Sequence, residues 1–501
     1  MTRRAYLRGA TALGVAGVAT GLAAPASAST SYDSRFSTVI DVVEAGADNT
    51  GTESITDVLR NNADDDTLLS FPSGTYYMDE QFRFSGFSNF GMVGSDATLL
   101  PAPIGDFQGP TYRLFRLGVT YAPGTDLLID GFTVDQTADN TGIRVVEAMI
   151  TDGLEVRNVT VNGKHDSGTW GPGFFSVTDP KGSGVVEAFE APDGGAWVSD
   201  TPNPIGLWRG PTGILLSRYH EGTITLRDCV LGGFPDNGLY GVTNGTVRVV
   251  GGTYENSHVA SVRLAGQDCL VRDATVRVTE NPTHFTNQRG IRLEGGAGFT
   301  IDNVSVDLQQ PNGHGISIKN DVSSARLESS KVTVADVPNH GIVLSPGCGD
   351  VDIVGTDVEI DGSGNAIQIN GTDAGKVVCE KVQVWGQASG RTWRHAIRCN
   401  RNNCEFRGVE IWQPGPHLRR ALVLNGDDCL VYNVLFRSRH HPIVVNGAGE
   451  WVQGSTLECY DDYAAIRLND SSADVTIKDN ALKDGVLNKG CARLRMYGNT
   501  E

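Results

Sequence analysis

Lysine is scarce in this sequence, Cys-x-x-Cys pairs are absent, and no long apolar run follows the N-terminal segment. Only 9 of the 41 basic residues are lysine, and the formal net charge is −18, which suits a salt-adapted exported protein. An acidic surface repels nucleic acid, so we expect no nucleic-acid partner. The nine cysteines include no Cys-x-x-Cys pair, and this absence argues against a zinc site. Beyond the N-terminal segment, no apolar run is long enough to span a bilayer.

The cysteines lie between Cys229 and Cys491. Their odd number leaves at least one of them unpaired or in an intermolecular bond. Cys399 and Cys404 flank a short turn, and two alternatives stay open for this pair: a disulfide bridge or buried free thiols.

Residues 1–28 are predicted to be an export signal. The stretch from Thr2 to Arg8 (TRRAYLR) resembles the twin-arginine export signal, and an apolar run rich in glycine and alanine follows it. Ala26-Ser27-Ala28 matches the small-residue pattern that signal peptidases accept. The segment predicts cleavage after Ala28 and a protein that is exported already folded, to the medium or the cell surface.

A short pattern recurs along the chain: a small residue, an aliphatic residue, any residue, and another aliphatic residue. Gly290-Ile291-Arg292-Leu293 and Gly315-Ile316-Ser317-Ile318 are two of its twelve copies, which from residue 213 onward lie about 21 to 30 residues apart. Each unit continues with short stretches that alternate apolar and polar residues, as strands with one buried face do. The pattern predicts an all-β fold, a right-handed parallel β-helix of about a dozen coils.

The repeat also divides the chain. We expect an N-terminal cap and entry over 29–100, the β-helix over 101–485, and a C-terminal end segment over 486–501. Residues 163–210 exceed the repeat length and are predicted to be an insertion. Because solenoid insertions fall on one face, often the binding face, Trp170 and Trp208 are predicted to stack on sugar rings.

The N-terminal region resembles a known superfamily. Val42 to Gly51 (VVEAGADNTG), followed by Phe71 to Tyr76 (FPSGTY), is similar to the entry segment of pectate-lyase-superfamily β-helix proteins. Between them, residues 54–61 carry apolar side chains on one face, and this short helix would cover the open end of the core. The resemblance implies the β-helix fold and leaves the chemistry open, because the superfamily includes lyases, hydrolases, epimerases and non-enzymes.

Two motifs resemble those of polygalacturonases: Gly313-His314-Gly315 and the pair Asp427-Asp428. In that family the aspartate pair shortly precedes the histidine, whereas here it follows His314 by more than a hundred residues. Both motifs also occupy positions that recur in other units, as Asn339-His340-Gly341 shows. We therefore reject polygalacturonase chemistry and assign these residues to the repeat.

Candidate chemistry lies on columns of the repeat, because equivalent residues of successive coils stack at about 4.8 Å. One outward column presents Tyr240, Arg263 and Arg292, and Lys319 comes one step along the next coil. These residues suit β-elimination of a uronic-acid polymer, in which a cation neutralises the carboxylate, a base removes the adjacent proton and an acid protonates the leaving oxygen. We predict that the catalytic residues are Tyr240, Arg263, Arg292, His314 and Lys319.

A neighbouring column holds Arg289, His314 and His340, and we predict that Arg289 and His340 bind substrate. One alternative is that the histidines form a turn ladder and take no part in chemistry. Another is that local carboxylates only balance the cations; the candidates are Glu255, Asp268 and Glu294.

Three function classes stay open: a lyase on an acidic polysaccharide, a non-catalytic extracellular glycan-binding or cell-envelope protein, and a glycoside hydrolase or epimerase. A hydrolase needs two carboxylates about 5 to 9.5 Å apart, for which Asp236 and Asp268 are the candidates. Ca²⁺ is a candidate cofactor without assigned ligands, because no compact acidic cluster stands out. The expected partner is a polysaccharide, and the oligomeric state is open. Five sequons are candidate glycosylation sites: Asn158, Asn244, Asn303, Asn370 and Asn469.

Overall fold

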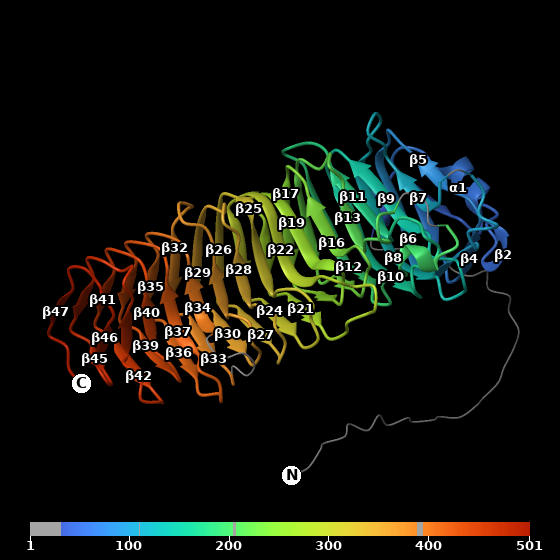
Figure 1. Cartoon of the computed structure of the whole chain (residues 1–501). Coiled ribbons are helices and arrows are strands. Elements are labelled where there is room, and N and C mark those ends of the chain that lie inside the picture. The colour runs from blue at the N-terminus through green and yellow to red at the C-terminus, as the bar shows by residue number, and fades with distance from the viewer. Residues whose placement is uncertain (1–31, 110, 204–206, 388–393) are drawn as a thin grey trace, which may run out of the picture.

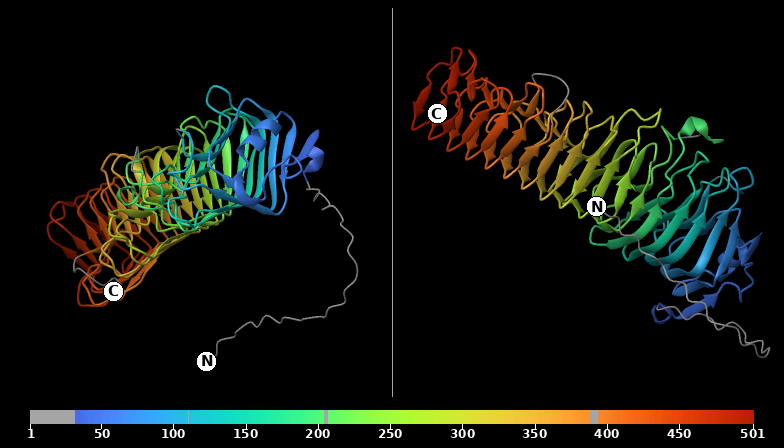
Figure 2. Two further views of the ribbon diagram at one scale, coloured as in Figure 1. Left: turned by 90° about the vertical axis from the view of Figure 1, so that its right-hand side faces the viewer. Right: turned by 90° about the horizontal axis from the view of Figure 1, so that it is seen from below.

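The computed structural model describes residues 32–109, 111–203, 207–387 and 394–501. The predicted export signal, residues 1–28, lies outside the described residues. The described chain winds into an elongated solenoid of about 17 turns, with the first and last coils at opposite ends (Figure 1, Figure 2). The predicted all-β, right-handed parallel β-helix is confirmed.

Two parallel sheets run along the solenoid: a larger sheet of 31 strands and a smaller sheet of 16 strands. In the smaller sheet each strand pairs with its equivalent in the next coil. Its strands, in spatial order, are β5 (Phe82–Phe84), β7 (Arg113–Leu117), β9 (Arg144–Ile150), β11 (Gly173–Val177), β13 (Ile214–Leu216), β16 (Asn237–Val242), β19 (Val259–Gln267), β22 (Gln288–Ala297), β25 (Ile316–Val322), β28 (Ile342–Leu344), β31 (Ile367–Ile369), β34 (His395–Cys399), β37 (Arg420–Leu424), β40 (Ile443–Val445), β43 (Ile466–Leu468) and β46 (Val486–Asn488).

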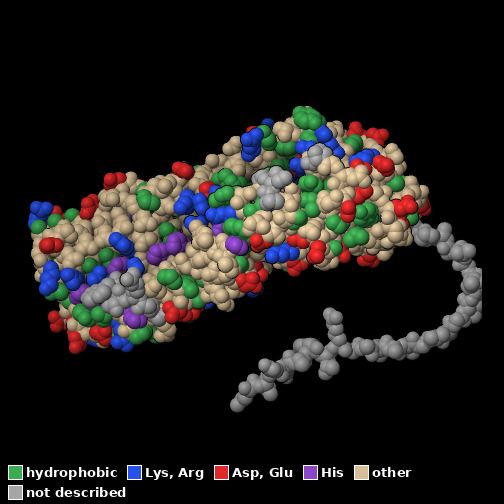
Figure 3. Space-filling model, turned by 45° about the vertical axis from the view of Figure 1, so that its right-hand side comes forward, with side chains coloured by type: hydrophobic (Ala, Val, Ile, Leu, Met, Phe, Trp, Pro, Cys, Tyr) green, Lys and Arg blue, Asp and Glu red, His purple; other side chains and the backbone are tan. Residues whose placement is uncertain are grey.

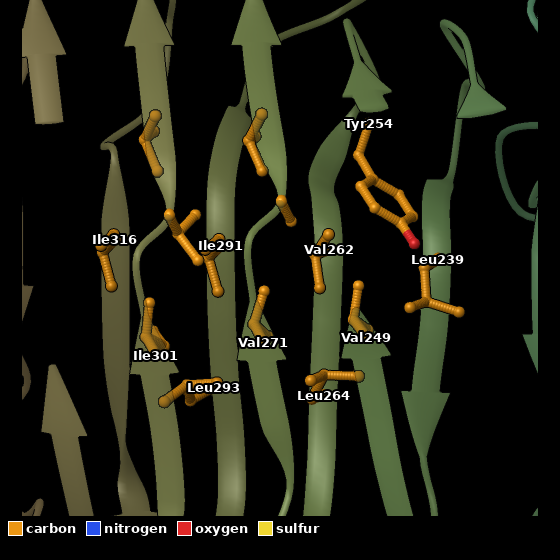
Figure 4. Packing of buried hydrophobic residues seen from close by; sticks show 14 of the residues in the cluster. Leu239, Val249, Tyr254, Val262, Leu264, Val271, Ile291, Leu293, Ile301 and Ile316 are labelled. Carbon is orange, nitrogen blue, oxygen red and sulfur yellow. The ribbon is translucent and has the colours of Figure 1, made fainter. Parts of the chain in front are cut away.

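Alternation along each strand separates the core from the surface. In β22, Ile291 and Leu293 are fully buried, whereas Arg292 between them lies on the outer face. Figure 4 shows the inward residues of neighbouring coils in rows, and Val262, Ile291 and Ile316 are paired in register across β19, β22 and β25. Burying one such side chain contributes about 1.5–3 kcal/mol. The core therefore depends on the inward columns, and the outward columns are available for function.

The number of coils exceeds the predicted dozen because some coils lack the aliphatic pattern. Phenylalanine takes the inward positions in three of them, at Phe82 in β5, Phe115 in β7 and Phe175 in β11. Part of the predicted insertion, 163–210, is thus a regular coil that contains β11 and β12 (Ser183–Ala191). At the other end, β46 and β47 (Arg495–Tyr497) extend the solenoid beyond residue 485.

The N-terminal end is covered by α1 (Thr56–Asn62), the one α-helix among the described residues. Ile55 and Leu59 are fully buried, and Val58 packs against the same core. The predicted helical cap is therefore confirmed, as a terminal coil of a solenoid requires. Within the described part of the chain, no helix has both the length and the apolar character that a membrane span needs.

Candidate functional site

The predicted outward column exists on the smaller sheet. Tyr240 in β16 pairs with Arg263 in β19, Arg263 pairs with Arg292 in β22, and Arg292 pairs with Ser317 in β25. Parallel pairing holds these four residues about 4.8 Å apart from coil to coil. Register alone therefore brings two arginines, an aromatic ring and a hydroxyl into one row.

Glu294 lies between the two arginines. Its Oε1 contacts Nε of Arg292 and lies 3.2 Å from Nε of Arg263. Neither Nε meets hydrogen-bond geometry, so these are charge contacts that leave hydrogen-bonding capacity on both guanidinium groups. On the other side, the guanidinium of Arg263 lies 4.7 Å from the ring centre of Tyr240, a cation–π contact.

Two further cations adjoin this group, and neither has an ion pair among the described residues: Arg289 and Lys319. Burial, together with the charge of Arg292, lowers the pKa of Arg289 to about 10. Burial also lowers the pKa of Lys319, as do the charges of Arg292 and Arg289. We call Arg263, Arg289, Arg292, Lys319 and Glu294 the cationic patch. Figure 3 shows Lys/Arg side chains gathered beside His side chains near the middle of one face.

The histidine column is a hydrogen-bonded ladder. The backbone N–H of His340 donates to Nδ1 of His314 over 3.2 Å, and that of Asn365 donates to Nδ1 of His340 over 2.8 Å. The two rings lie 4.9 Å apart. Burial lowers both pKa values to about 4. Each neutral ring thus carries its proton on Nε2 and cannot take another there, so neither histidine is placed to act as a general base.

Tyr240 and Lys319 are too far apart to act as acid and base on one sugar linkage. Tyr240 lies three coils from Lys319 (β16 to β25), which is about 14 Å at the strand spacing. An acid and a base that act on adjoining atoms of one sugar linkage must lie much closer together. Tyr240 instead supports Arg263 through its ring.

The predicted carboxylate pair of a hydrolase is wrong. Asp236 directly precedes β16 and lies level with Val259, the first residue of β19, whereas Asp268 follows the last residue of that strand. Nine residues of extended chain separate the two levels, or roughly 30 Å. Asp236 accepts a hydrogen bond from the Thr212 hydroxyl (2.8 Å). The two aspartates therefore flank opposite ends of the strands.

Two hollows flank the coils of the cationic patch. Where the chain enters β16, β19 and β22, a pocket of about 400 Å³ is lined by Trp197, by Phe285 and by four carboxylates, those of Asp193, Asp200, Glu255 and Glu280. Where the chain leaves these strands, a second hollow of about 530 Å³ is lined by Arg218 and by backbone from Gly266, Gly295 and Gly296. The patch lies between an acidic aromatic pocket and a glycine-lined one.

Trp197, which the sequence analysis did not select, is the tryptophan that lines the acidic pocket. Trp197 stacks on His284 with ring centres 5.3 Å apart. Trp170, which is 48% exposed, instead lines a separate pocket with Arg113, and Trp208, which is 72% exposed, lies beneath the guanidinium of Arg209 at 3.8 Å. The position of Trp197 depends on the path of the loop between β12 and β13, which no repeat pattern describes.

A second cationic cluster lies four coils or more toward the N-terminus on the same sheet, and sequence reasoning missed it. The carboxylate of Glu147 contacts Arg113 and lies 3.0 Å from Arg116 and 2.6 Å from Arg144. Arg144 is 3% exposed, and its guanidinium lies 4.9 Å from the ring of Phe174. Three arginines again surround a single carboxylate, so the smaller sheet has two positively charged regions.

The sequons differ in environment. Asn244 is exposed and lines the glycine-lined hollow. Asn158 and Asn303 donate hydrogen bonds to aspartates of the preceding coil, over 2.7 and 2.6 Å. Asn370 and Asn469 are partly buried members of an asparagine ladder on consecutive coils.

No protein-family model and no curated protein matches the sequence. Solved structures match the chain at low identity and low TM-score. The match to ORF18 of Geobacillus virus E2 has 12% identity and TM-score 0.29, and covers 82% of this chain and 61% of that one. The match to the catalytic unit of an α-1,3-glucanase from Streptomyces thermodiastaticus has 13% identity and TM-score 0.33, and covers 92% of this chain and 69% of that one. The match to the mannuronan C-5 epimerase A-module of Azotobacter vinelandii has 11% identity and TM-score 0.28, and covers 92% of this chain and 99% of that one. These values assign no chemistry to this chain.

Proposed function

We propose that the protein binds an acidic polysaccharide on the outer face of the smaller sheet, at the cationic patch. The observation that carries this proposal is a charge imbalance. On a chain of net charge −18, Arg263, Arg289, Arg292 and Lys319 surround the single carboxylate of Glu294. Like charges held together in a partly desolvated row are costly unless an anionic ligand compensates them.

The unused hydrogen-bonding capacity of the patch supports the same ligand class. The arginine guanidinium groups match carboxylates in shape and charge. Ser317, next in the row after Arg292, has a buried hydroxyl without a hydrogen-bond partner among the described residues. The ring of Tyr240 and the two flanking hollows offer contacts for neutral parts of a sugar chain.

β-Elimination on the same face is the second candidate function, and the state of Lys319 favours it. The pKa of its amine is lowered beside Arg289 and Arg292. These two arginines would neutralise the uronate carboxylate. Lys319 would remove the proton next to the carboxylate, the electron pair would form the carbon–carbon double bond, and the bond to the leaving oxygen would break. Water or a sugar hydroxyl would protonate that oxygen, since Tyr240 lies too far away.

Binding is tested by affinity electrophoresis of the full chain in polygalacturonate, alginate and neutral dextran, at low and high salt. We expect retention in an acidic polymer that weakens with salt. Arg292→Ala should bind about tenfold more weakly, the effect of losing one charged contact. The matched control is Arg272→Ala, an exposed arginine of the larger sheet that pairs with Asp302. Equal loss in both variants, or equal retention in dextran, would overturn the proposal.

Activity is tested with the same polymers, with and without Ca²⁺. A lyase gives ultraviolet absorbance from the unsaturated uronate, and this signal should disappear in Lys319→Gln while binding persists. New reducing ends without that absorbance would instead indicate hydrolysis at the acidic pocket, and Glu280→Gln should abolish them. Binding with neither signal identifies a non-catalytic glycan-binding protein.

An extracellular location belongs to the same proposal and rests on residues 1–28. N-terminal sequencing of the mature protein from the medium or cell surface should begin at Ser29. Recovery of the intact N-terminus from the cell interior alone would contradict export.

A further inference from the structure

Three cysteines converge inside the C-terminal half of the solenoid. The sulfur atoms of Cys399, Cys404 and Cys429 all lie within 4.8 Å of one another. All three side chains are buried, with at most 1% exposure. Among the described residues this is the one group of three or more histidine, cysteine or acidic side chains compact enough to hold a metal ion.

The cluster results from stacking. Cys404 and Cys429 directly precede β35 (Glu405–Arg407) and β38 (Leu430–Tyr432), which pair in register, so the two cysteines occupy one column on consecutive coils. Cys399 ends β34 and reaches the same interior from the other side of the turn. Four residues separate Cys399 from Cys404, and twenty-four separate Cys404 from Cys429. The cluster therefore contains no Cys-x-x-Cys pair, and its sequence spacing does not reveal it.

The column itself is otherwise apolar. The coils before Cys404 place Val351 and Val377 at the equivalent position, and the coil after Glu450 places Val475 there; all three are fully buried. Side chains able to bind metal replace this valine column on three successive coils.

Glu450 is the third of these side chains and gives a second, independent indication of a ligand. It directly precedes β41 (Trp451–Gln453), which pairs with β38, so it stacks on Cys429. Its Oε2 accepts the backbone N–H of Cys429 over 2.8 Å. Glu450 is 0% exposed, and its Oε1 has no hydrogen-bond partner among the described residues. A buried carboxylate oxygen without a partner is costly in an apolar column.

Arg401 supplies a buried charge that such a site would balance. Its side chain is 0% exposed, and no carboxylate lies within ion-pair distance of it among the described residues. It donates to backbone carbonyls and to Sγ of Cys348 (3.2 Å), while its own carbonyl oxygen lies 3.3 and 3.4 Å from Sγ of Cys399 and Cys429. One divalent cation with three thiolates carries a charge of −1, or −2 with the Glu450 carboxylate included, which is opposite in sign to the charge of the guanidinium.

We propose that Cys399, Cys404 and Cys429 bind a thiophilic divalent cation of the zinc class inside the solenoid, with Glu450 as the adjoining oxygen donor. Zinc sites built from three cysteines and one further ligand are structural, and sulfur–metal distances of about 2.3 Å suit sulfurs this close. Binding releases the three thiol protons. The bound ion would link the coil that contains Cys399 and Cys404 to the next coil, which contains Cys429. A disulfide would use two of the sulfurs and leave Arg401 and Glu450 uncompensated.

The test uses the full chain, produced with added zinc and purified without chelator under anaerobic conditions. Elemental analysis should find about one zinc per chain, as a single closed site requires. Cys404→Ser and Cys429→Ser should lower the metal content at least tenfold. Cys229→Ser is the matched control, because Cys229 is an equally buried thiol in a remote coil, and it should keep the metal.

A second measurement keeps the proposal testable if the serine variants do not fold. Wild-type protein stripped of metal is titrated with Co(II), which gives sulfur-to-metal charge-transfer bands and tetrahedral d–d bands when thiolates bind it. Saturation at one equivalent supports the site. Absence of these bands together with absence of zinc overturns it, as does a disulfide between two of the three cysteines in the anaerobically purified protein.

Discussion

The backbone N–H of His340 donates a hydrogen bond to Nδ1 of His314, with 3.2 Å between the two nitrogens. This contact repeats one coil later, from Asn365 to His340. It gives the Gly-His-Gly segment a structural role, because the ring nitrogen that accepts is unavailable for proton transfer. The histidine that looks catalytic in sequence is therefore one rung of a ladder.

The ladder makes stability depend on pH. The pKa values of His314 and His340 are about 4 in the folded protein, below the value of about 6.5 for an unfolded histidine. The unfolded chain therefore binds protons first as pH falls, and stability is complete above pH 6.5 and declines between about 6.5 and 4. Denaturant unfolding across this window should lose of the order of 1–3 kcal/mol per histidine.

The double variant His314→Gln/His340→Gln should show a shallower decline over the same window. His284→Gln removes an exposed histidine and should leave the slope unchanged. Part of the dependence should persist in the double variant, because burial lowers the pKa values of His165 and His395 to about 3. An unchanged slope in the double variant would show that the ladder histidines do not stay neutral in the fold.

Glu294→Gln tests the electrostatics of the cationic patch. The change leaves Arg263 and Arg292 without a carboxylate, so the free energy of unfolding at low salt should fall by roughly 1 kcal/mol, as for a partly exposed ion pair. Affinity for an acidic polymer should rise several-fold, because the patch gains positive charge. Glu328→Gln is the control, since Glu328 pairs with Arg326 on the larger sheet. Weaker binding by Glu294→Gln would mean that Glu294 orients the arginines for the ligand.

The asparagine ladder predicts which sequons can carry a glycan. The Asn469 side chain donates to Asn446, and Asn446 donates in turn to Asn425 over 2.6 Å. A glycan on Asn469 would disrupt this hydrogen bond, and Asn370 is tied to the Leu344 carbonyl in the same way (3.0 Å). In a host that glycosylates exported proteins, glycopeptide mass spectrometry should find sugar on Asn244 and not on Asn469. Sugar on Asn469 and none on Asn244 would show that Asn469 is accessible, either before the ladder forms or through opening of the ladder in the folded protein.

Much of the fold was predictable because the chemistry of a solenoid is periodic. Alternation by two residues identified the inward side chains, and the repeat spacing then set the register that places Tyr240, Arg263 and Arg292 in one row. Glu294, already a candidate counter-charge from the sequence, follows two residues after Arg292 on the same face, where alternation by two residues puts it.

The rest depended on turns and loops, where no period applies. Asp236 and Asp268 were candidates by residue type alone, and one precedes its strand whereas the other follows it. Trp197 reaches the acidic pocket through a loop whose path only tertiary structure reveals. The cysteine cluster needed the turn after β34 to fold Cys399 back toward Cys404. The Phe-containing coils near the N-terminus do not match the repeat, because phenylalanine takes the place of the aliphatic residues at their inward positions.

Two buried tyrosines of the core should respond differently to loss of the hydroxyl group. Tyr76 and Tyr254 are both 0% exposed. The Tyr76 hydroxyl donates to the Pro72 carbonyl over 2.6 Å, whereas the Tyr254 hydroxyl has no hydrogen-bond partner among the described residues and faces apolar side chains such as Leu239 (Figure 4). Removing a satisfied hydroxyl costs about 1 kcal/mol, and removing a buried unsatisfied one relieves a desolvation penalty of similar size.

Tyr76→Phe should therefore lower the denaturant midpoint, and Tyr254→Phe should leave it unchanged or raise it. Because a solenoid is stabilised coil by coil, amide hydrogen exchange should show each effect in the coils next to the substitution and little change elsewhere. A lower midpoint for Tyr254→Phe would mean that a buried water satisfies this hydroxyl inside the core. That outcome would also make the interior near β16 polar enough to hold water, in contrast to the dry apolar packing of Leu239 and its neighbours (Figure 4).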